Sequence, residues 1–372
     1  MVLWRGRLWI SDSKNHRLRV VAMTGSYFRG DAEAVLARGD IGLAESWLDG
    51  LWDSPDPAAL LSLLAANRPT LAKAVYGSVC SLLGARLRHA FNANTRAGSR
   101  RNILAHYDLG NDFYRLWLDP GMSYSSGIHS DASTSLDDAQ AAKHARIVDL
   151  LELGPADDVL EIGCGWGGLA AEILPHARSL TAITISAQQF EATRARLAAT
   201  EHAARADVVF QDYRDTTGSF DRIVSIEMIE AVGEDNWPAY FRTLDERLKP
   251  GGSAVIQAIT IRDDLYEGYR RSPDFIQRYI FPGGMLPTVA AMRCHAQSNG
   301  LQFEEVLSFG SDYAVTLRAW QERFHDKWPL IARLGFDERF RRMWDYYLTY
   351  CAVGFERGLI DVGLFRLRKP SA

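Results

Sequence analysis

The fold is decided by the stretch Val159-Leu160-Glu161-Ile162-Gly163-Cys164-Gly165-Trp166-Gly167-Gly168. It is a short apolar strand that runs into a turn in which four of six residues are glycine. Glycine adopts positive φ easily and lacks the Cβ atom that would keep a ligand away from the backbone. Residues 169–174 then have the pattern of a helix that begins at the same turn. The stretch therefore predicts a ligand-binding turn between a strand and a helix.

The spacing of the glycines does not identify the ligand. Gly163, Gly165 and Gly168 also satisfy the dinucleotide-binding pattern, which normally requires an acidic residue about twenty positions later. The next predicted strand, 179–184, leads into Ile-Ser and offers no carboxylate for a ribose. A nicotinamide or flavin site and a merely structural turn remain as alternatives.

Strand and helix patterns alternate around this turn. Apolar runs predict strands over 179–184, 207–211, 221–226 and 253–259, and helical periodicity predicts helices over 136–151, 187–199 and 236–248. Such alternation is typical of an α/β fold with a mostly parallel sheet.

Two segments interrupt the alternation. Residues 261–290 include an aromatic and basic stretch, which we interpret as a cover over the substrate. Closing strands are predicted over 303–308 and 362–367. They enclose a helical segment that carries Trp320, Phe324, Trp328, Trp344, Tyr346, Tyr347 and Phe355.

A chain of 372 residues suits two or three domains. Residues 1–22 show no clear periodicity, and we assign them no fold. Residues 23–95 predict a small helical, lipid-associated domain, followed by a basic linker over 96–105 and a catalytic domain over 106–372. The helical spacing rests on two sets, which are Leu43, Trp47, Leu48, Leu51 and Trp52, and then Leu71, Val75, Val79, Leu83, Leu87 and Phe91.

Composition restricts the class of protein. No apolar run reaches the roughly 18 residues of a membrane span, and no signal peptide core is present. The four cysteines show no Cys-x-x-Cys spacing, so we expect no disulfide framework and no metal site. We infer a cytoplasmic protein.

The net charge of −4 conceals a basic N-terminal region. Residues 1–101 carry 14 Lys and Arg against 8 Asp and Glu, and no acidic residue occurs from Pro57 to Tyr107. Such a stretch favours an anionic partner, for which we expect a membrane surface and no nucleic acid. Its basic residues are Arg68, Lys73, Arg86, Arg88, Arg96, Arg100 and Arg101.

Several blocks of sequence, in order, resemble the cyclopropane-fatty-acyl-phospholipid synthase family, which includes the mycolic acid cyclopropane synthases. The resemblance covers roughly residues 100–369. The glycine turn and Gln211-Asp212-Tyr213 also resemble class I S-adenosylmethionine-dependent methyltransferases. The matching blocks lie at 106–114, 124–125, 163–170, 184–189, 211–215, 220–225, 279–284 and 309–313.

The resemblance implies a class I methyltransferase fold, with a Rossmann-like, mostly parallel sheet and helical insertions. It implies S-adenosylmethionine as the cofactor and a cis double bond in an acyl chain of a membrane phospholipid as the substrate. The implied location is the inner face of the membrane, with a homodimer as a further option. The positions matching cofactor-binding residues are Tyr124, Ser125, Gly163, Gly165, Thr184, Gln189, Asp212 and Tyr213.

Members of the family also hold a bicarbonate ion, and this sequence departs from their pattern there. Glu230, Ile259 and Tyr313 match ion-holding positions, but Ser126 stands where Cys is usual and Gln257 where His is usual. Gln can donate a hydrogen bond, and backbone N–H contacts would survive these changes. We therefore expect a weakened anion site.

Glu227 adds a carboxylate near the end of the fourth strand, within a helical turn of Glu230. It is either the base that removes a proton after methyl transfer or a carboxylate without that role. We expect a cyclopropane product, with a methyl-branched alkene or diene as the alternative. A non-catalytic acyl-chain or cofactor sensor and a methyltransferase for a small molecule are further alternatives.

We predict that residues 57–101 form a membrane-docking face. Each Lys or Arg near an anionic bilayer contributes on the order of 1 kcal/mol, and salt attenuates this attraction. Co-sedimentation with anionic vesicles should therefore fall between low and high ionic strength. Equal binding to neutral vesicles would contradict the prediction.

Overall fold

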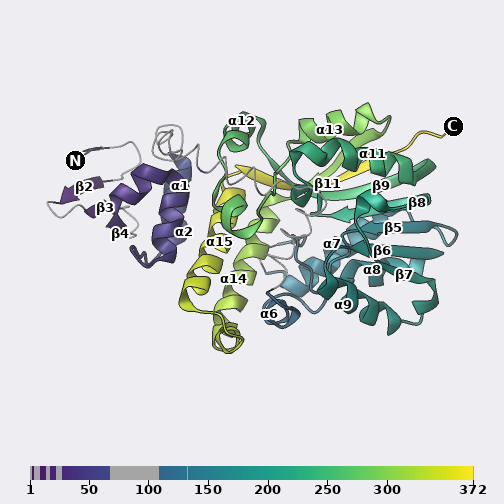
Figure 1. Cartoon of the computed structure of the whole chain (residues 1–372), viewed down its shortest axis with the longest axis horizontal. Coiled ribbons are helices and arrows are strands. Elements are labelled where there is room, and N and C mark those ends of the chain that lie inside the picture. The colour runs from purple at the N-terminus through teal and green to yellow at the C-terminus, as the bar shows by residue number, and fades with distance from the viewer. Residues whose placement is uncertain are drawn as a thin grey trace.

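A seven-stranded sheet lies between two layers of helices in the part of the molecule away from the N-terminus (Figure 1). The computed structural model describes residues 2–3, 9–13, 17–21, 27–67, 109–131 and 133–371, with side chains from residue 39 onward. The sheet has the order β10-β11-β9-β8-β5-β6-β7. Its strands are β5 (Asp158–Ile162), β6 (Ser179–Thr184), β7 (Ala206–Phe210), β8 (Phe220–Ile226), β9 (Leu248–Ile261), β10 (Gln302–Ser308) and β11 (Ile360–Arg368).

The sheet is mostly parallel, as predicted. Strands β7, β6, β5, β8 and β9 run parallel, whereas β11 is antiparallel to both of its neighbours. The predicted strands agree closely with the observed ones, except that β9 begins earlier. Leu248 already pairs with Phe220 before the register shifts at the following turn.

Helices cover both faces of the sheet (Figure 1). Successive side chains of a strand point to opposite faces. Val159 of β5 accordingly packs in the cluster under α7, α8 and α9, and Leu160 packs in the cluster under α11 and α13. These helices are α7 (Leu136–Leu151), α8 (Gly168–Ile173), α9 (Ala187–Ala198), α11 (Trp237–Arg247) and α13 (Val289–Ser298).

Local signals fix the ends of α7 at the predicted residues. The Ser135 hydroxyl accepts a hydrogen bond from the Asp138 N–H at 3.1 Å, which satisfies a free donor of the first turn. Glu152 adopts a left-handed conformation with φ of 51° and ends the helix.

Two helical insertions lie over the carboxyl edge of the sheet. The first follows β9 and contains α12 (Asp263–Arg271) and the π-helix η5 (Ile276–Ile280). The second separates β10 from β11 and contains α14 (Gly310–Arg333) and α15 (Glu338–Glu356), which confirms the predicted helical segment. Shorter elements are α6 (Asn111–Arg115), α10 (Ile229–Val232), η1 (Leu174–His176), η2 (Ala203–Arg205), η3 (Tyr213–Asp215) and η4 (Glu234–Asn236).

The N-terminal part differs from the sequence analysis. A four-stranded antiparallel sheet of β1 (Val2–Leu3), β2 (Trp9–Ser13), β3 (Arg17–Val21) and β4 (Tyr27–Asp31) precedes the helices. We assigned no fold to residues 1–22, but β3 lies within this segment and pairs with β4, which lies beyond it. Strands of five residues are too short for a clear period, and the partners that stabilise them are not visible in a pattern.

Two helices follow, α1 (Ala32–Leu48) and α2 (Pro57–Ala66). The predicted helical set extended to Trp52, but α1 ends at Leu48, Gly50 turns the chain with φ of 68°, and Leu51 is 55% exposed. Asp56 caps α2 by accepting from the Ala59 N–H at 2.8 Å. The described residues do not include the second helical set, the linker or the basic residues from Arg68 to Arg101. They also do not include His106, the first residue of the matching block at 106–114. In the described ranges, no helix combines the length and apolar character needed to cross a bilayer.

Arg342 on α15 links α1 to the second insertion. Its guanidinium carbon lies 4.0 Å from the ring centroid of Trp47. The guanidinium donates to the carbonyl oxygen of Trp47 at 2.5 Å and to that of Trp52 at 2.8 Å. The Trp47 indole N–H donates in return to the Arg342 carbonyl oxygen at 2.9 Å.

We expect Arg342→Ala to lower the free energy of unfolding by about 2 kcal/mol, because the carbonyl oxygens of Trp47 and Trp52 lose their charged hydrogen-bond donor. Arg339→Ala is the matched control on the same helix. Its ion pair with Asp49, at 3.2 Å, is exposed on both sides and contributes about 0–1 kcal/mol. Urea denaturation followed by tryptophan fluorescence measures both, and equal effects would contradict the assignment.

Candidate active site

A cavity of ≈ 610 Å³ begins at the carboxyl ends of β5, β6 and β8 and continues to the helices α1 and α2. The carboxyl ends of parallel strands meet at one edge of the sheet, where open α/β sheets bind ligands. Gly163, Thr184 and Glu227 line the cavity at this edge, and Leu43 and Leu60 line it at the other end. One hollow therefore joins a polar region to an apolar one.

The glycine turn presents its backbone to the cavity. The N–H groups of Gly163 and Cys164 donate to the Ile183 carbonyl oxygen at 3.0 and 3.1 Å, which ties the turn to β6. Gly163 and Gly165 have φ of 81° and 54°. A Cβ atom on Gly165 would meet no atom within 4 Å. Since Gly165 lines the cavity, that open space is where a ligand can approach the backbone.

The structure places all eight predicted cofactor-binding residues on the wall of this cavity. The Thr184 hydroxyl donates to Gln189 Oε1 at 2.9 Å, which links the end of β6 to the start of α9. Asp212 pairs with Arg214 at 2.6 Å, at the end of β7. The eight lining residues are Tyr124, Ser125, Gly163, Gly165, Thr184, Gln189, Asp212 and Tyr213.

Two buried polar groups on the cavity wall fit a polar, cationic ligand. Glu161 is 3% exposed, and its Oε2 has no hydrogen-bond partner among the described residues. Burial raises the pKa of Glu161 to about 8, and Lys143 opposes this shift. The buried Tyr213 hydroxyl likewise lacks a partner among the described residues. S-Adenosylmethionine, with its sulfonium and ammonium groups, fits this donor and acceptor set.

Lys143 is a residue of this site that sequence reasoning missed. It lies on α7, is 1% exposed, and donates from Nζ to the Ser125 hydroxyl at 2.8 Å. Burial lowers the pKa of Lys143 to about 8, against the attraction of Glu227, Asp119 and Glu161. A lysine in an amphipathic helix is usually exposed, but Lys143 occupies the apolar stripe of α7 between Leu136 and Ile147. That position was the available signal.

Glu227 is the most strongly held carboxylate at the centre of the cavity. Its Oε1 accepts from the Ser126 N–H at 3.0 Å and from Gln257 Nε2 at 2.8 Å, and its Oε2 accepts from the Tyr313 hydroxyl at 2.7 Å. Its backbone has φ of 48°, which is unfavourable for a residue with a side chain. The Glu227 N–H donates to the Gln257 carbonyl oxygen at 2.8 Å and holds that conformation.

Burial controls the protonation of both central glutamates. It raises the pKa of Glu227, although the bonds from Tyr313, Ser126 and Gln257 favour the ionised form. It raises the pKa of Glu230 to about 8, and the charge of Glu227 adds to this shift. Glu230 Oε1 accepts from the Ile259 N–H at 2.5 Å. Glu227 is therefore the better hydrogen-bonded and more readily ionised of the two.

The positions that the resemblance assigns to a bicarbonate ion are used by these glutamates. Tyr313, the Ser126 N–H and the Gln257 amide bond Glu227, and the Ile259 N–H bonds Glu230. Ser126 and Gln257 are fully buried behind the cavity wall. The donors that the resemblance assigns to the ion therefore hold Glu227 and Glu230 in this structure.

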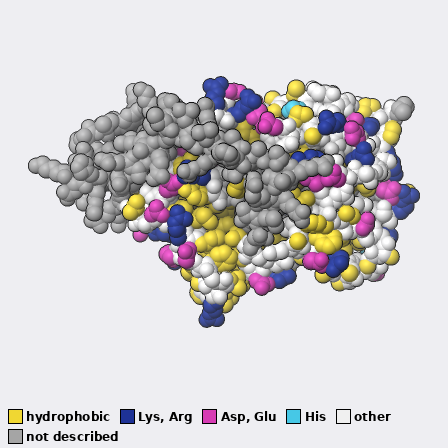
Figure 2. All heavy atoms as spheres, viewed as in Figure 1, with side chains coloured by type: hydrophobic (Ala, Val, Ile, Leu, Met, Phe, Trp, Pro, Cys, Tyr) yellow, Lys and Arg dark blue, Asp and Glu magenta, His cyan; other side chains and the backbone are white. Residues whose placement is uncertain are grey.

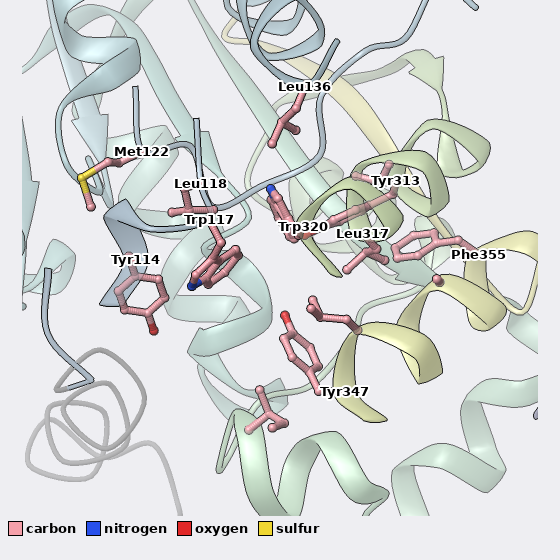
Figure 3. Packing of buried hydrophobic residues seen from close by; sticks show 14 of the residues in the cluster. Tyr114, Trp117, Leu118, Met122, Leu136, Tyr313, Leu317, Trp320, Tyr347 and Phe355 are labelled. Atoms are coloured by element: carbon pink, nitrogen blue, oxygen red, sulfur yellow. The ribbon is translucent and has the colours of Figure 1, made fainter. Parts of the chain in front are cut away.

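Aromatic side chains form the wall opposite the glycine turn. Figure 3 shows Tyr313, Tyr347 and Phe355 gathered from α14 and α15. The hydroxyls of Tyr347 and Tyr124 are 2.9 Å apart, so the second insertion contacts the loop that carries Ser125. Trp320 is fully buried and lies behind Tyr124, with ring centroids 5.3 Å apart. It supports the wall without lining the cavity.

We predict that Gly165→Val abolishes binding of S-adenosylhomocysteine, because a β-branched side chain would fill the open space beside the turn. Gly300→Val is the matched control. Gly300 has φ of 76° and also no atom within 4 Å of a built Cβ, but it lies outside the cavity. Calorimetric titration compares the two. Unchanged affinity in Gly165→Val would place the cofactor elsewhere.

Comparison with known proteins identifies the family. Residues 94–365 match the family model described as mycolic acid cyclopropane synthetase. The crystal structure of mycolic acid cyclopropane synthase CmaA1 complexed with SAH and CTAB has a TM-score of 0.68 and 30% identity, and the match covers 73% of this chain and 98% of that one. The structural match confirms the class I methyltransferase fold.

Two full-length relatives extend the match into the N-terminal part. The tuberculostearic acid methyltransferase UfaA1 of Mycobacterium tuberculosis is 38% identical over 339 residues, which cover 89% of this chain and 79% of the relative. The cyclopropane-fatty-acyl-phospholipid synthase of Escherichia coli is 39% identical over 326 residues, which cover 86% and 81%. The chain therefore belongs to the mycolic acid cyclopropane synthetase family and is an S-adenosylmethionine-dependent methyltransferase.

Proposed function

We propose that the enzyme methylates a cis double bond in an unsaturated acyl chain of a membrane phospholipid, and that Glu227 removes the proton that completes the reaction. The observation that carries this proposal is the Glu227 carboxylate, held by three donors on the wall of a cavity that continues into an apolar region. The phospholipid is proposed from the acid-free basic stretch and from the name of the Escherichia coli relative.

An alkene is a weak nucleophile, so it requires close alignment with the methyl donor in a dry slot. When bound, S-adenosylmethionine supplies the methyl group to the double bond, and a positive charge develops on the neighbouring chain carbon. The rings of Tyr313, Tyr347 and Phe281 line the cavity and can stabilise that charge through their π faces. The carboxylates of Glu227 and Glu230 add electrostatic stabilisation.

Proton removal then completes the reaction. The C–H bond of a carbon beside the cation breaks, its electron pair forms the new C=C bond, and the Glu227 carboxylate takes the proton. A raised pKa makes this carboxylate a better acceptor, while its three donors keep it ionised until then. After product release the proton passes to solvent.

We propose a methyl-branched unsaturated chain as the product, in place of the cyclopropane expected from the sequence. The expectation of a ring depended on a bound anion that directs removal of a proton from the new methyl group. Glu227 is anchored at the end of β8 and bonded on both oxygens, so it approaches the chain from one direction. A proton on a carbon beside the cation then competes with one on the new methyl. The relative named as a methyltransferase, and not as a cyclopropane synthase, is consistent with this choice.

We expect Glu227→Gln to lower turnover by at least about 100-fold, because the amide cannot accept the proton, while affinity for S-adenosylhomocysteine stays within a few-fold. Glu234→Gln, which changes a carboxylate paired with Arg270 at 2.8 Å outside the cavity, is the matched control. The assay is transfer of label from the cofactor to unsaturated phospholipid vesicles. Normal turnover in Glu227→Gln would exclude Glu227 as the base.

Mass spectrometry of the wild-type product decides the branch. The cyclopropane and the methyl-alkene have the same mass, but only the alkene gains two hydrogens under mild hydrogenation. An added-carbon chain that resists this treatment would establish the ring as the product. If no label passes from the cofactor to phospholipid at any enzyme concentration, the phospholipid proposal is wrong.

A further inference from the structure

We infer that the helix pair α1 and α2 forms part of the acyl-chain site, as a subsite that selects the length of the chain. This inference rests on the proposed acyl-chain substrate. The helix pair precedes the residues matched by the family model, so the subsite would be an addition to the family's catalytic domain.

The cavity itself supplies the first observation. Leu43 of α1 and Leu60, Leu61 and Leu64 of α2 line the same hollow as the glycine turn and Glu227. Leu43, Leu60 and Leu61 are 7%, 4% and 6% exposed, so they face the interior of the molecule and not bulk solvent. A ligand in the catalytic part of the cavity can therefore extend to these leucines without leaving it.

The opposite wall belongs to the two insertions of the catalytic domain. Tyr346, Tyr350 and Val353 come from α15, and Ile276 comes from η5. Phe281 and Tyr347 continue the lining toward the reacting centre. Figure 1 shows α1 and α2 beside α15, and Figure 2 shows hydrophobic side chains gathered at the surface over α14 and α15. The space between the helix pair and the insertions is thus bounded mainly by apolar side chains, although Asp40 and Asp274 also line it.

Polar contacts hold the two walls together at the edges of this space. The buried Glu45 of α1 accepts from the Tyr279 hydroxyl at 2.6 Å and pairs with Arg278 at 2.9 Å. On the other side, Arg357 donates to the Ser62 hydroxyl of α2 at 2.6 Å. Tyr279 lies two residues before Phe281, so the segment fastened to α1 also lines the cavity. These contacts, together with those of Arg342, hold the helix pair against the insertions.

The chemistry of the lining identifies the occupant. Leucine, valine and aromatic side chains offer contact to methylene groups and little to a charged headgroup. The double bond must lie near Glu227 and Tyr313, where the reaction occurs. The part of the acyl chain beyond the double bond is then the segment that reaches α1 and α2. The volume left between the helix pair and α15 limits how many carbons that segment can contain.

Leu64→Trp tests the subsite by filling it, and Leu60→Ala tests it by enlarging it. The probe is a set of anionic phospholipid vesicles carrying equal amounts of two cis-monounsaturated chains with the double bond at the same carbon but different total lengths. Leu64→Trp should lower methylation of the longer chain by about tenfold relative to the shorter one. Leu60→Ala should shift the ratio toward the longer chain. Ala66→Trp, on the exposed side of α2, is the control and should leave the ratio unchanged.

The opposite shifts separate the inference from general damage to the fold. A misfolded variant loses both chains equally and loses affinity for S-adenosylhomocysteine, which is measured for each variant. Length ratios that stay within twofold of wild type in both Leu64→Trp and Leu60→Ala would overturn the subsite, and so would an equal loss of both chains. A wild-type enzyme that labels no lipid would instead refute the proposed function.

Discussion

The carboxylate of Glu227 and its three donors are the constraint on which the site depends. The donors come from three separate parts of the chain: the loop before α7, strand β9 and helix α14. Each bond therefore fixes one element relative to the end of β8. Removing water from a carboxylate is costly unless hydrogen bonds replace the lost solvation. The second insertion thus supplies one of the donors that hold Glu227 in place.

The same arrangement explains why the cavity can be polar in one place and apolar elsewhere. Ser126 and Gln257 meet Glu227 from behind the wall, so they satisfy the charge without exposing further polar surface. Lys143 donates to the Ser125 hydroxyl, and its positive charge attracts Glu227, Asp119 and Glu161. Most of the remaining wall consists of aromatic and aliphatic side chains.

The sequence was sufficient where the signal is local. The glycine turn, the helix over 136–151 and the alternation of strands with helices were all visible as patterns in the sequence. The sequence was insufficient where a structure depends on contacts between residues that are distant in sequence. Tyr313 and Glu227 are 86 positions apart, so no local pattern indicates their hydrogen bond, and the strands up to residue 31 depend on partners that no periodicity identifies. Lys143 was missed for a different reason: its place in the apolar stripe of α7 was visible, but a lysine is rarely buried.

The positive φ of Glu227 has a consequence for how such an enzyme can change over time. A residue with a side chain in this region costs on the order of 1 kcal/mol or more, and glycine would relieve that cost. Against that relief, glycine would leave the donors of Ser126, Gln257 and Tyr313 without their acceptor, and it would remove the carboxylate that the proposed reaction requires. A screen of random variants for heat resistance can therefore select folded proteins that no longer catalyse the reaction.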